Sequence, residues 1–149
     1  MIIASNIEKS FGPQVLFDGV SFLINPGERI GLVGKNGTGK STLFRMILGD
    51  EKQDSGTLST PKSYRIGALE QHIHFTYPTV LAECIQALPA EKQWDHYKAE
   101  IILSGLGFSE QDFQKDPSTF SGGFQVRINL CKALLADPNM LLLDEPTNY

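Results

Sequence analysis

The residues whose types and spacing point most directly to chemistry form the segment GKNGTGKS, Gly34 to Ser41. This segment matches the pattern G-x-x-x-x-G-K-[ST] in full. Its glycines let successive backbone N-H groups point into one concavity, which suits a phosphate group. A chance glycine-rich turn is the alternative, but a predicted strand before the segment and a predicted helix after it favour a nucleotide-binding loop. In such a loop Lys40 reaches the β- and γ-phosphates, and the Ser41 hydroxyl ligates Mg²⁺.

Two adjacent carboxylates, Asp144 and Glu145, follow the apolar run MLLL. Asp144 can hold Mg²⁺ directly or through water, and Glu145 can orient or deprotonate a water molecule aimed at the γ-phosphate. Acidic residues often do no more than cap the end of an element, so the pair alone says little. Together with the phosphate loop, it predicts nucleotide hydrolysis.

A third segment, FSGGFQ, opens a long helical pattern. Ser121 can cap that helix, while Gly122 and Gly123 bring backbone N-H groups within reach of an anion. A cap followed by flexible glycines is the structural alternative. A second helix start that suits phosphate, in one small domain, favours a ligand-binding role.

The spacing of apolar residues outlines the elements that must position these segments. The stretches MIIASNI and VLFDGVSFLIN predict a β-rich beginning, and the apolar residues Ile30 to Val33 predict a strand that runs into the phosphate loop. Helical spacing then predicts a helix from Lys40 to Leu48, with Gly49 as its stop. SGTLSTPKSYRIGALEQ predicts a turn and further strand.

A broken helical pattern runs from Thr79 to about Gly105, and we expect its aromatic residues Trp94 and Tyr97 to pack inside. A longer helix starts at Ser121 and stops before Pro138. Its apolar face contains Phe124, Ile128, Cys131 and Leu135. The following MLLLD is apolar on both sides, as a strand in a covered parallel sheet must be.

These elements predict an α/β fold. We expect a P-loop NTPase core with a mostly parallel sheet, an N-terminal antiparallel β lobe and a small helical subdomain.

The composition of the 149 residues, 41% hydrophobic and 20% charged, is that of a soluble globular protein. No apolar run approaches the roughly 20 residues of a membrane span, and no secretory signal is visible, so we expect a cytoplasmic protein without direct membrane insertion. A net charge of -4 gives no basic footprint for nucleic acid over the whole domain. Cys84 and Cys131 are expected to be reduced and packed.

Taken together, the motifs resemble the nucleotide-binding domain of the ATP-binding-cassette (ABC) family. GKNGTGKS is similar to the Walker A loop, and MLLLDEP is similar to Walker B. FSGGFQ occupies the place of the signature Leu-Ser-Gly-Gly-Gln, with Phe120 for Leu and Phe124 for Gln. The order of the motifs and the helical region between them also agree, so the resemblance covers essentially the whole chain.

The resemblance implies one nucleotide-binding domain over residues 1–149, incomplete at its C-terminus just after Walker B. Its core and β lobe would comprise about residues 1–77 and 121–149, and its helical subdomain about residues 78–120. ATP and Mg²⁺ are the implied cofactors. A second ABC domain, bound head to tail, is the implied partner.

The resemblance also implies roles for residues outside the three motifs. Phe11 would stack on adenine, and Gln71 would touch Mg²⁺ and the attacking water. The implied catalytic residues are Glu145, Gln71 and Lys40, and the implied magnesium ligands are Ser41, Gln71 and Asp144. The implied ATP-binding set is Phe11, Gly34, Lys35, Asn36, Gly37, Thr38, Gly39, Lys40, Ser41 and Thr42. Ser121, Gly122 and Gly123 would contact the ATP molecule held by the other domain.

Within the family, the aromatic residue at the last signature position, together with GLGFS and DEPTN, is similar to the ABC-F group. That group consists of tandem-domain ATPases without a membrane domain that act on the ribosome. Many of their first domains carry a long basic helical arm, whereas between Gln71 and Ser121 this sequence has room only for short helices.

Two alternatives remain open. The closest alternative to the ABC-F group is the cytoplasmic ATP-binding subunit of an ABC transporter, which uses the same motifs and whose partner is a membrane permease. It could also be a non-catalytic nucleotide-binding fragment, because the family's D-loop and switch histidine do not follow Tyr149. On that ground we expect the chain as printed to be weakly active or inactive, and the intact protein to be an ATPase.

Overall fold

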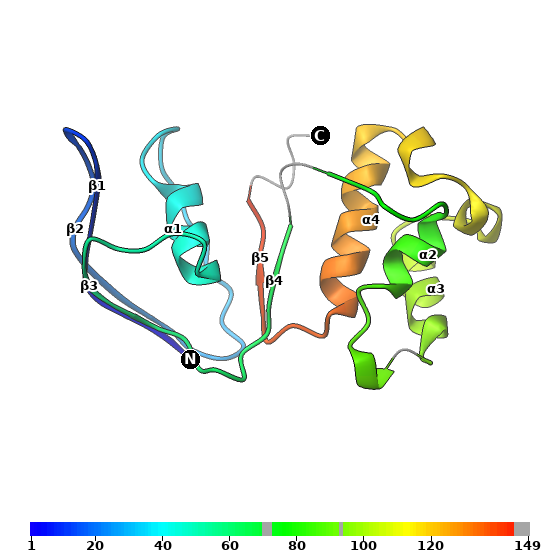
Figure 1. Ribbon diagram of the computed structural model, residues 1–149, viewed down its shortest axis with the longest axis horizontal. Coiled ribbons are helices and arrows are strands. Elements are labelled where there is room, and N and C mark those ends of the chain that lie inside the picture. The colour runs from blue at the N-terminus through cyan, green and yellow to red at the C-terminus, as the bar shows by residue number, and fades with distance from the viewer. Residues whose placement is uncertain (70–72, 93, 145–149) are drawn as a thin grey trace. The chain divides into compact units, whose positions relative to one another are not determined.

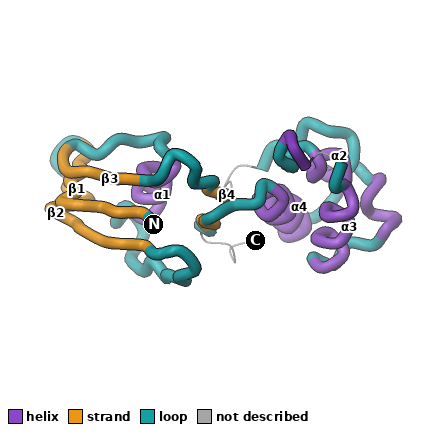
Figure 2. The backbone as a smooth tube through the Cα atoms, turned by 90° about the horizontal axis from the view of Figure 1, so that it is seen from below, coloured by secondary structure: helices purple, strands orange, loops and turns teal. Residues whose placement is uncertain are grey.

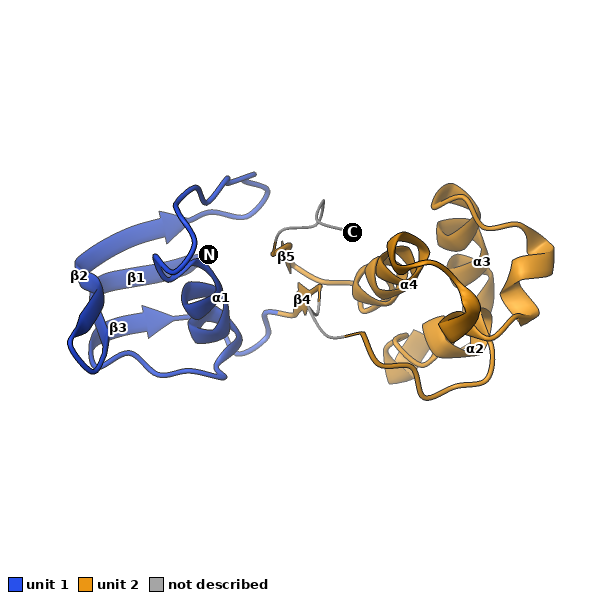
Figure 3. Ribbon diagram, turned by 90° about the horizontal axis from the view of Figure 1, so that it is seen from above, with its two compact units in different colours: residues 1–64 blue, residues 65–149 orange. Residues whose placement is uncertain are grey.

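The computed structural model describes residues 1–69, 73–92 and 94–144 (Figure 1). The chain divides into two compact units, residues 1–64 and residues 65–149 (Figure 3). Among the described residues, no helix is both long and apolar enough to cross a membrane.

The first unit contains an antiparallel sheet with the strand order β2-β1-β3 (Figure 2). Its strands are β1 (Ile2–Phe11), β2 (Gln14–Ile24) and β3 (Ser55–Ser59). In β1 the side chains of Ile2, Ala4 and Ile7 are buried. The shift from even to odd positions occurs at Asn6, whose φ of 47° marks a bulge in the ladder. The bulge keeps Ile7 on the buried face, and the sheet confirms the predicted N-terminal β lobe.

Helix α1 (Lys40–Leu48) follows the phosphate loop and confirms the helix predicted from the sequence. Gly49 ends it with a φ of 88°, and the Gly49 N-H donates to the carbonyl of Met46. Met46 packs with Ala4 and Ile7 in a buried cluster, so the apolar face of the helix lies on the β1 side of this unit.

The strand predicted at residues 30–33 is wrong. Neither of the two sheets that the structure describes includes this segment. The side chains of Ile30, Leu32 and Val33 are 60%, 44% and 94% exposed. An apolar run becomes a strand only where neighbouring strands accept and donate its backbone hydrogen bonds, and no described strand does so here.

The second unit contains a parallel pair of short strands, β4 (Ile66–Ala68) and β5 (Met140–Leu142). Gly67 lies so close to helix α4 (Gly122–Leu135) that a Cβ atom there would stand 3.0 Å from the Ala133 carbonyl oxygen. The parallel pairing of β5 with β4 confirms the strand predicted from MLLLD. The antiparallel lobe, the parallel pair and the helices together confirm the predicted α/β class.

Helices make up the rest of the second unit. The α-helices besides α4 are α2 (Val80–Ile85) and α3 (His96–Gly105), and the short 3₁₀ helices are η1 (Ala90–Lys92), η2 (Glu110–Gln114) and η3 (Pro117–Thr119). Their shared core consists of Val80, Cys84, Leu88, Ala99, Leu103, Phe108, Phe113, Ile128, Cys131 and Leu135. The predicted apolar face of α4 is confirmed, because its residues belong to this core or pack against it.

The core confirms one expectation about single residues and corrects another. Cys84 and Cys131 are buried free thiols, as expected. The expectation that Trp94 and Tyr97 pack inside is wrong, because these side chains are 91% and 55% exposed. The buried side of α3 is formed by its small and aliphatic residues, Ala99 and Leu103 among them.

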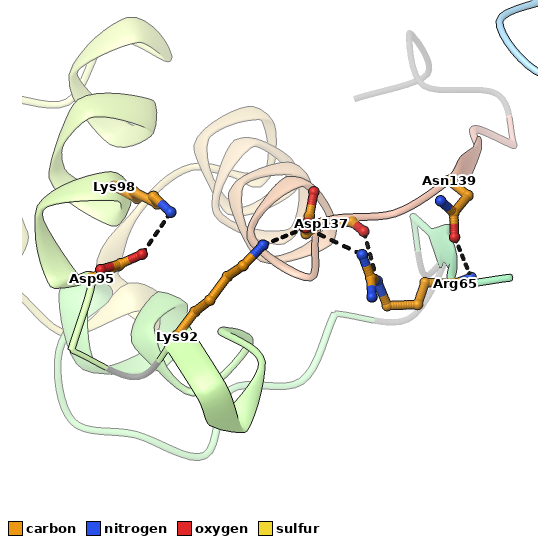
Figure 4. A network of polar contacts seen from close by, with 6 residues as sticks. All are labelled: Arg65, Lys92, Asp95, Lys98, Asp137 and Asn139. Carbon is orange, nitrogen blue, oxygen red and sulfur yellow. Dashed lines mark hydrogen bonds and ion pairs between the residues drawn. The ribbon is translucent and has the colours of Figure 1, made fainter. Parts of the chain in front are cut away.

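The turn between α4 and β5 is held by a polar network around Asp137 (Figure 4). The Arg65 Nε donates to the Asp137 carbonyl oxygen at 2.8 Å, and Lys92 Nζ lies 2.5 Å from the Asp137 carboxylate. Asn139 accepts a hydrogen bond from the Arg65 backbone at 2.8 Å. Asp137 has a φ of 51°, so α4 ends before Pro138, as the sequence predicts. The network aligns the first residues of β4 and β5.

The division into a core and a helical subdomain at residues 77/78 and 120/121 stays a prediction. In the structure the boundary between units lies at 64/65, and α4 shares its core with α2 and α3.

Candidate functional site

The phosphate loop in the first unit takes a conformation that depends on its glycines. Gly37 and Gly39 have φ values of 81° and 98°, a region that side-chain-bearing residues rarely adopt. Between them, Thr38 donates from its backbone N-H and its hydroxyl to the Lys35 carbonyl, at 3.3 and 2.8 Å. The loop therefore closes on itself through the Thr38 hydrogen bonds to the Lys35 carbonyl.

Lys40 lies over this loop. Its Nζ donates to the carbonyl oxygens of Gly34 at 2.9 Å and Lys35 at 3.1 Å. Residues 35–38 are exposed, and Lys40 itself is half-buried. A positive charge held at the mouth of a loop with exposed backbone groups is an arrangement that can receive an anion.

The start of α1 adds a second attraction for negative charge. Its N-cap is Gly39, which has no side chain to accept from the N-H groups of the first turn, and no acidic residue lies in that turn. The N-H groups and the helix dipole at a helix start favour a phosphate. The structure thus brings together Gly34, Lys35, Thr38 and Lys40 of the predicted ATP-binding set.

Phe11 ends strand β1 in the same unit. Its ring is 46% exposed, and the Lys9 ammonium lies 5.0 Å from the ring centroid. An exposed aromatic face is available for stacking, and the adenine-stacking role of Phe11 stays a prediction.

The predicted signature residues lie at the start of α4 in the second unit. Ser121 is the N-cap, but its side chain makes no capping hydrogen bond, so the predicted capping role of the hydroxyl is wrong. Gln125 instead stabilises the helix start, because its Nε2 donates to the carbonyls of Phe120 at 2.8 Å and Ser118 at 3.2 Å. With that support, Ser121 and Gly122 are exposed and half-buried Gly123 follows them.

The two phenylalanines that depart from the family signature share one aromatic cluster with Phe108. The ring centroid of Phe108 lies 5.5 Å from that of Phe120 and 5.1 Å from that of Phe124, both edge to face. Arg127 covers Phe124, with its guanidinium carbon 4.7 Å from the ring centroid. Phe108 belongs to the segment GLGFS, so this segment and the altered signature are parts of one packing arrangement.

The structure describes some of the remaining predicted site residues and not others. Asp144 follows β5 after Leu143 and is within the described chain. Gln71 and Glu145 lie outside the described residues. Within the described ranges, no group of three or more His, Cys, Asp or Glu side chains could hold a metal ion. Ser41 and Asp144 offer the hard oxygen ligands that Mg²⁺ prefers, and their magnesium role stays a prediction.

A buried ion pair in the second unit was not anticipated from the sequence. Glu83, only 2% exposed, accepts from Lys132 Nζ at 2.5 Å and from the backbone N-H groups of Thr76 and Tyr77, both at 2.9 Å. Burial raises the pKa of the Glu83 carboxyl, but these hydrogen bonds outweigh burial and hold the pKa below its ordinary value. A glutamate in the first turn of an otherwise apolar helix is the signal that could have indicated it.

Comparison with known proteins places these features in a family. The sequence profile described as ABC transporter matches residues 17–148. The probable ATP-binding protein YheS of Escherichia coli K12 is 32% identical over 179 aligned positions, with 100% of this chain covered. The energy-dependent translational throttle protein EttA of the same organism is 38% identical, with 97% covered. Both relatives are ABC-F proteins.

A further relative is the uncharacterized ABC transporter ATP-binding protein YfmM of Bacillus subtilis, 30% identical with 100% of this chain covered. All three relatives are much longer, since the chain spans 28% of YheS, 26% of EttA and 37% of YfmM.

Solved structures share the fold. MJ0796, a bacterial ABC transporter cassette, superposes with a TM-score of 0.79 at 23% identity, covering 99% of this chain and 75% of that one. CbiO1 from Clostridium perfringens, part of an ABC transporter complex, gives a TM-score of 0.79 at 24% identity, covering 98% and 65%. The predicted P-loop NTPase fold of the ABC cassette is confirmed.

Proposed function

The chain belongs to the ABC transporter family of ATP-binding cassettes, and from that premise we propose that it is the ATP-hydrolysing cassette of an ABC-F type protein. In this proposal, ATP draws it together with a second ABC cassette, and this closure is coupled to an event of translation on the ribosome in the cytoplasm. The similarity to EttA, whose name describes a translational throttle, supports the ribosomal part.

The observation that carries the nucleotide part is the geometry around Lys40. Its ammonium lies over a loop closed by left-handed glycines at the uncapped start of α1. In the free loop this charge is satisfied by two backbone carbonyls, and a bound phosphate offers stronger, charge-assisted hydrogen bonds. Exchange of these partners requires only a rotation of the lysine side chain.

The remaining roles form part of the same proposal. The N-H groups of residues 34–42 bind the phosphates, and Phe11 stacks on the adenine. Ser41 and Asp144 hold Mg²⁺, with Gln71 as a further ligand. Bound Mg²⁺ neutralises charge on the β- and γ-phosphate oxygens. Glu145 takes a proton from the attacking water.

The exposed start of α4 is proposed to face the second cassette. Ser121, Gly122 and Gly123 present a hydroxyl and backbone N-H groups that no capping interaction engages. Such groups can bind the γ-phosphate held by the partner cassette, which makes closure dependent on ATP.

A second candidate is the ATP-binding subunit of an ABC transporter with a membrane permease as partner. The similarity to YfmM, named as a transporter ATP-binding protein, favours it. Both candidates use the same nucleotide chemistry, and they differ in the partner that closure moves. A non-catalytic nucleotide-binding fragment is a third outcome, which nucleotide binding without phosphate release would identify.

Nucleotide binding is tested by titrating the chain with a fluorescent ATP analogue and Mg²⁺ while recording polarisation. We expect Lys40→Ala to weaken binding at least about tenfold, since it removes a charge-assisted contact to phosphate. Lys62→Ala is the matched control, because it removes an exposed lysine of the same unit that is not part of the loop. Equal affinity of the Lys40→Ala variant and the unmodified chain would overturn the assignment of the loop. Binding without turnover would identify a non-catalytic module.

The partner is tested by co-sedimentation of a Glu145→Gln variant of the longest available form of the protein. We expect it to pellet with purified ribosomes when ATP is present and to stay in solution with ADP. Pelleting with permease-containing vesicles and not with ribosomes would replace the ABC-F proposal with the transporter one.

A further inference from the structure

An open groove in the helical unit lies apart from the residues assigned to nucleotide binding. It has a volume of about 650 Å³ and is lined by Glu100, Ile101, Ser104, Glu110 and Phe113. Three of these residues come from helix α3 and two from η2. On α3 they are spaced at three and four residues, so they form one continuous face of that helix.

The groove contains two carboxylates, those of Glu100 and Glu110. Two other acidic residues of this unit pair with lysines, Asp95 with Lys98 and Asp112 with Lys115. Within the described part of the chain, Glu100 and Glu110 make no hydrogen bond or ion pair. Both are exposed, so the groove presents two negative charges that the protein itself does not compensate.

The groove also presents apolar surface. Ile101 of the lining is 64% exposed, and beside the groove Tyr97, one helical turn earlier on α3 and not part of the lining, is 55% exposed. Phe113 lines the same groove from η2 and is itself buried, at 6% exposed. Exposed apolar surface is unfavourably hydrated, and apolar surface bordered by charged residues is typical of surfaces that bind a partner.

We propose that this groove binds a cationic, amphipathic peptide segment of a protein partner. Lysine or arginine side chains would pair with Glu100 and Glu110, and apolar side chains would cover Ile101 and Tyr97. Charge excludes the phosphate backbone of a nucleic acid, which the two carboxylates would repel. A segment that is basic but not apolar would leave Ile101 exposed. The inference rests on residues 97–113 and does not depend on the nucleotide.

The test uses a fluorescently labelled 18-residue peptide of Leu and Lys, with leucines at helical spacing, and measures anisotropy with the full chain. We expect saturable binding that weakens as salt is raised, because exposed charges are screened. Two probes of matched length accompany it, a Glu/Leu peptide and a single-stranded RNA, and neither is expected to bind.

Variants locate the contact on the groove. Glu100→Gln combined with Glu110→Gln removes both charges without changing side-chain size and is expected to weaken binding about fivefold or more. Ile101→Ser is expected to weaken it roughly tenfold, through lost apolar burial. Glu91→Gln is the matched control, since it removes an exposed carboxylate of the same unit that does not line the groove. It is expected to change affinity less than twofold.

Three results would overturn the proposal. One is the absence of saturable binding by the Lys/Leu peptide. Another is an equal loss of affinity in the Glu91→Gln control, which would indicate non-specific attraction by the acidic chain. The third is comparable binding of the RNA probe. Circular dichroism of each variant verifies that the helices are intact, so that a lost signal reports the surface and not the fold.

Discussion

The two units of the molecule differ in how far they bury their apolar side chains and pair their buried polar ones. In residues 65–149, ten buried residues from α2, α3, α4 and the segments between them share one core, and the buried carboxylate of Glu83 has three hydrogen-bond donors. In residues 1–64, the segment before the phosphate loop leaves three apolar side chains exposed, Val33 at 94%. The helical unit therefore buries a shared apolar core, whereas the unit that contains the proposed phosphate loop leaves apolar side chains exposed.

The conformation of the proposed phosphate loop accounts for part of this difference. A loop that must receive phosphate needs exposed N-H groups and left-handed glycines, and both reduce the stability that local packing provides. The unit that contains such a loop needs support from neighbouring strands. In the described part of the helical unit the apolar side chains share one core, and the binding surfaces proposed for this unit are the start of α4 and the groove on α3.

The largest expected effect separates the two units by stability. Leu103→Ala removes a fully buried side chain from the helical core and is expected to lower the free energy of unfolding by about 2–5 kcal/mol. Val33→Ala, in the exposed segment, is expected to change it by less than about 0.5 kcal/mol. Urea denaturation followed by circular dichroism at 222 nm measures both, since the single tryptophan, Trp94, is 91% exposed and a poor reporter of packing.

A decrease of more than about 1 kcal/mol in the free energy of unfolding for Val33→Ala would contradict the difference in packing between the two units. It would mean that Val33 is buried in solution and that the segment before the phosphate loop is packed as tightly as the helical core.

An effect of intermediate size is expected at the buried ion pair of the helical unit. Glu83→Gln keeps the size of the side chain but removes the charge that faces Lys132 and the N-H groups of Thr76 and Tyr77. We expect a loss of about 1–3 kcal/mol in the free energy of unfolding. Glu91→Gln, at an exposed carboxylate, is the control and should stay within about 0.5 kcal/mol.

The pH dependence gives the same pair a second signature. The pKa of Glu83 lies below its ordinary value of 4.5, so the ionised carboxylate stabilises the fold above that pH. This contribution is lost as the pH falls through the lowered pKa. Unfolding at a series of pH values from 6 to 3 should therefore show a flatter decline for Glu83→Gln than for the unmodified chain. Identical slopes would show that Glu83 does not carry the acid sensitivity of this unit.

Local patterns were enough to predict much of the fold. The helix from Lys40 to Leu48 follows from apolar spacing and the stop at Gly49, and β5 follows from a short apolar run after a helix. The loop conformation follows from the glycine pattern, because Gly37 and Gly39 adopt the left-handed backbone that the motif requires. Each of these signals lies within about ten residues, where sequence reasoning is reliable.

Features that depend on residues far apart in the sequence could not be predicted from local patterns. The run Ile30 to Val33 is apolar enough for a strand, but strand formation depends on pairing that no local pattern contains. Glu83 and Lys132 are 49 residues apart, so the glutamate in the first turn of α2 could indicate a buried carboxylate but not its partner. The prediction that Trp94 packs inside was wrong for another reason. It relied on the size of the side chain, whereas the position of Trp94 before α3 leaves it exposed.

The smallest expected effect concerns two helix starts of the same unit. Thr79 caps α2 by accepting a hydrogen bond from the Ala82 N-H at 3.2 Å, so Thr79→Ala should cost about 1 kcal/mol of unfolding free energy. Ser121 is the N-cap of α4 but makes no such bond, so Ser121→Ala should cost less than about 0.5 kcal/mol. Equal decreases in the free energy of unfolding for the two variants would show that the Ser121 hydroxyl caps α4 in solution. The start of α4 would then not differ from that of α2. A neutral Ser121→Ala that slows ATP turnover in the two-cassette form would instead show that the hydroxyl serves a ligand, and would make the start of α4 the counterpart, in the helical unit, of the phosphate loop.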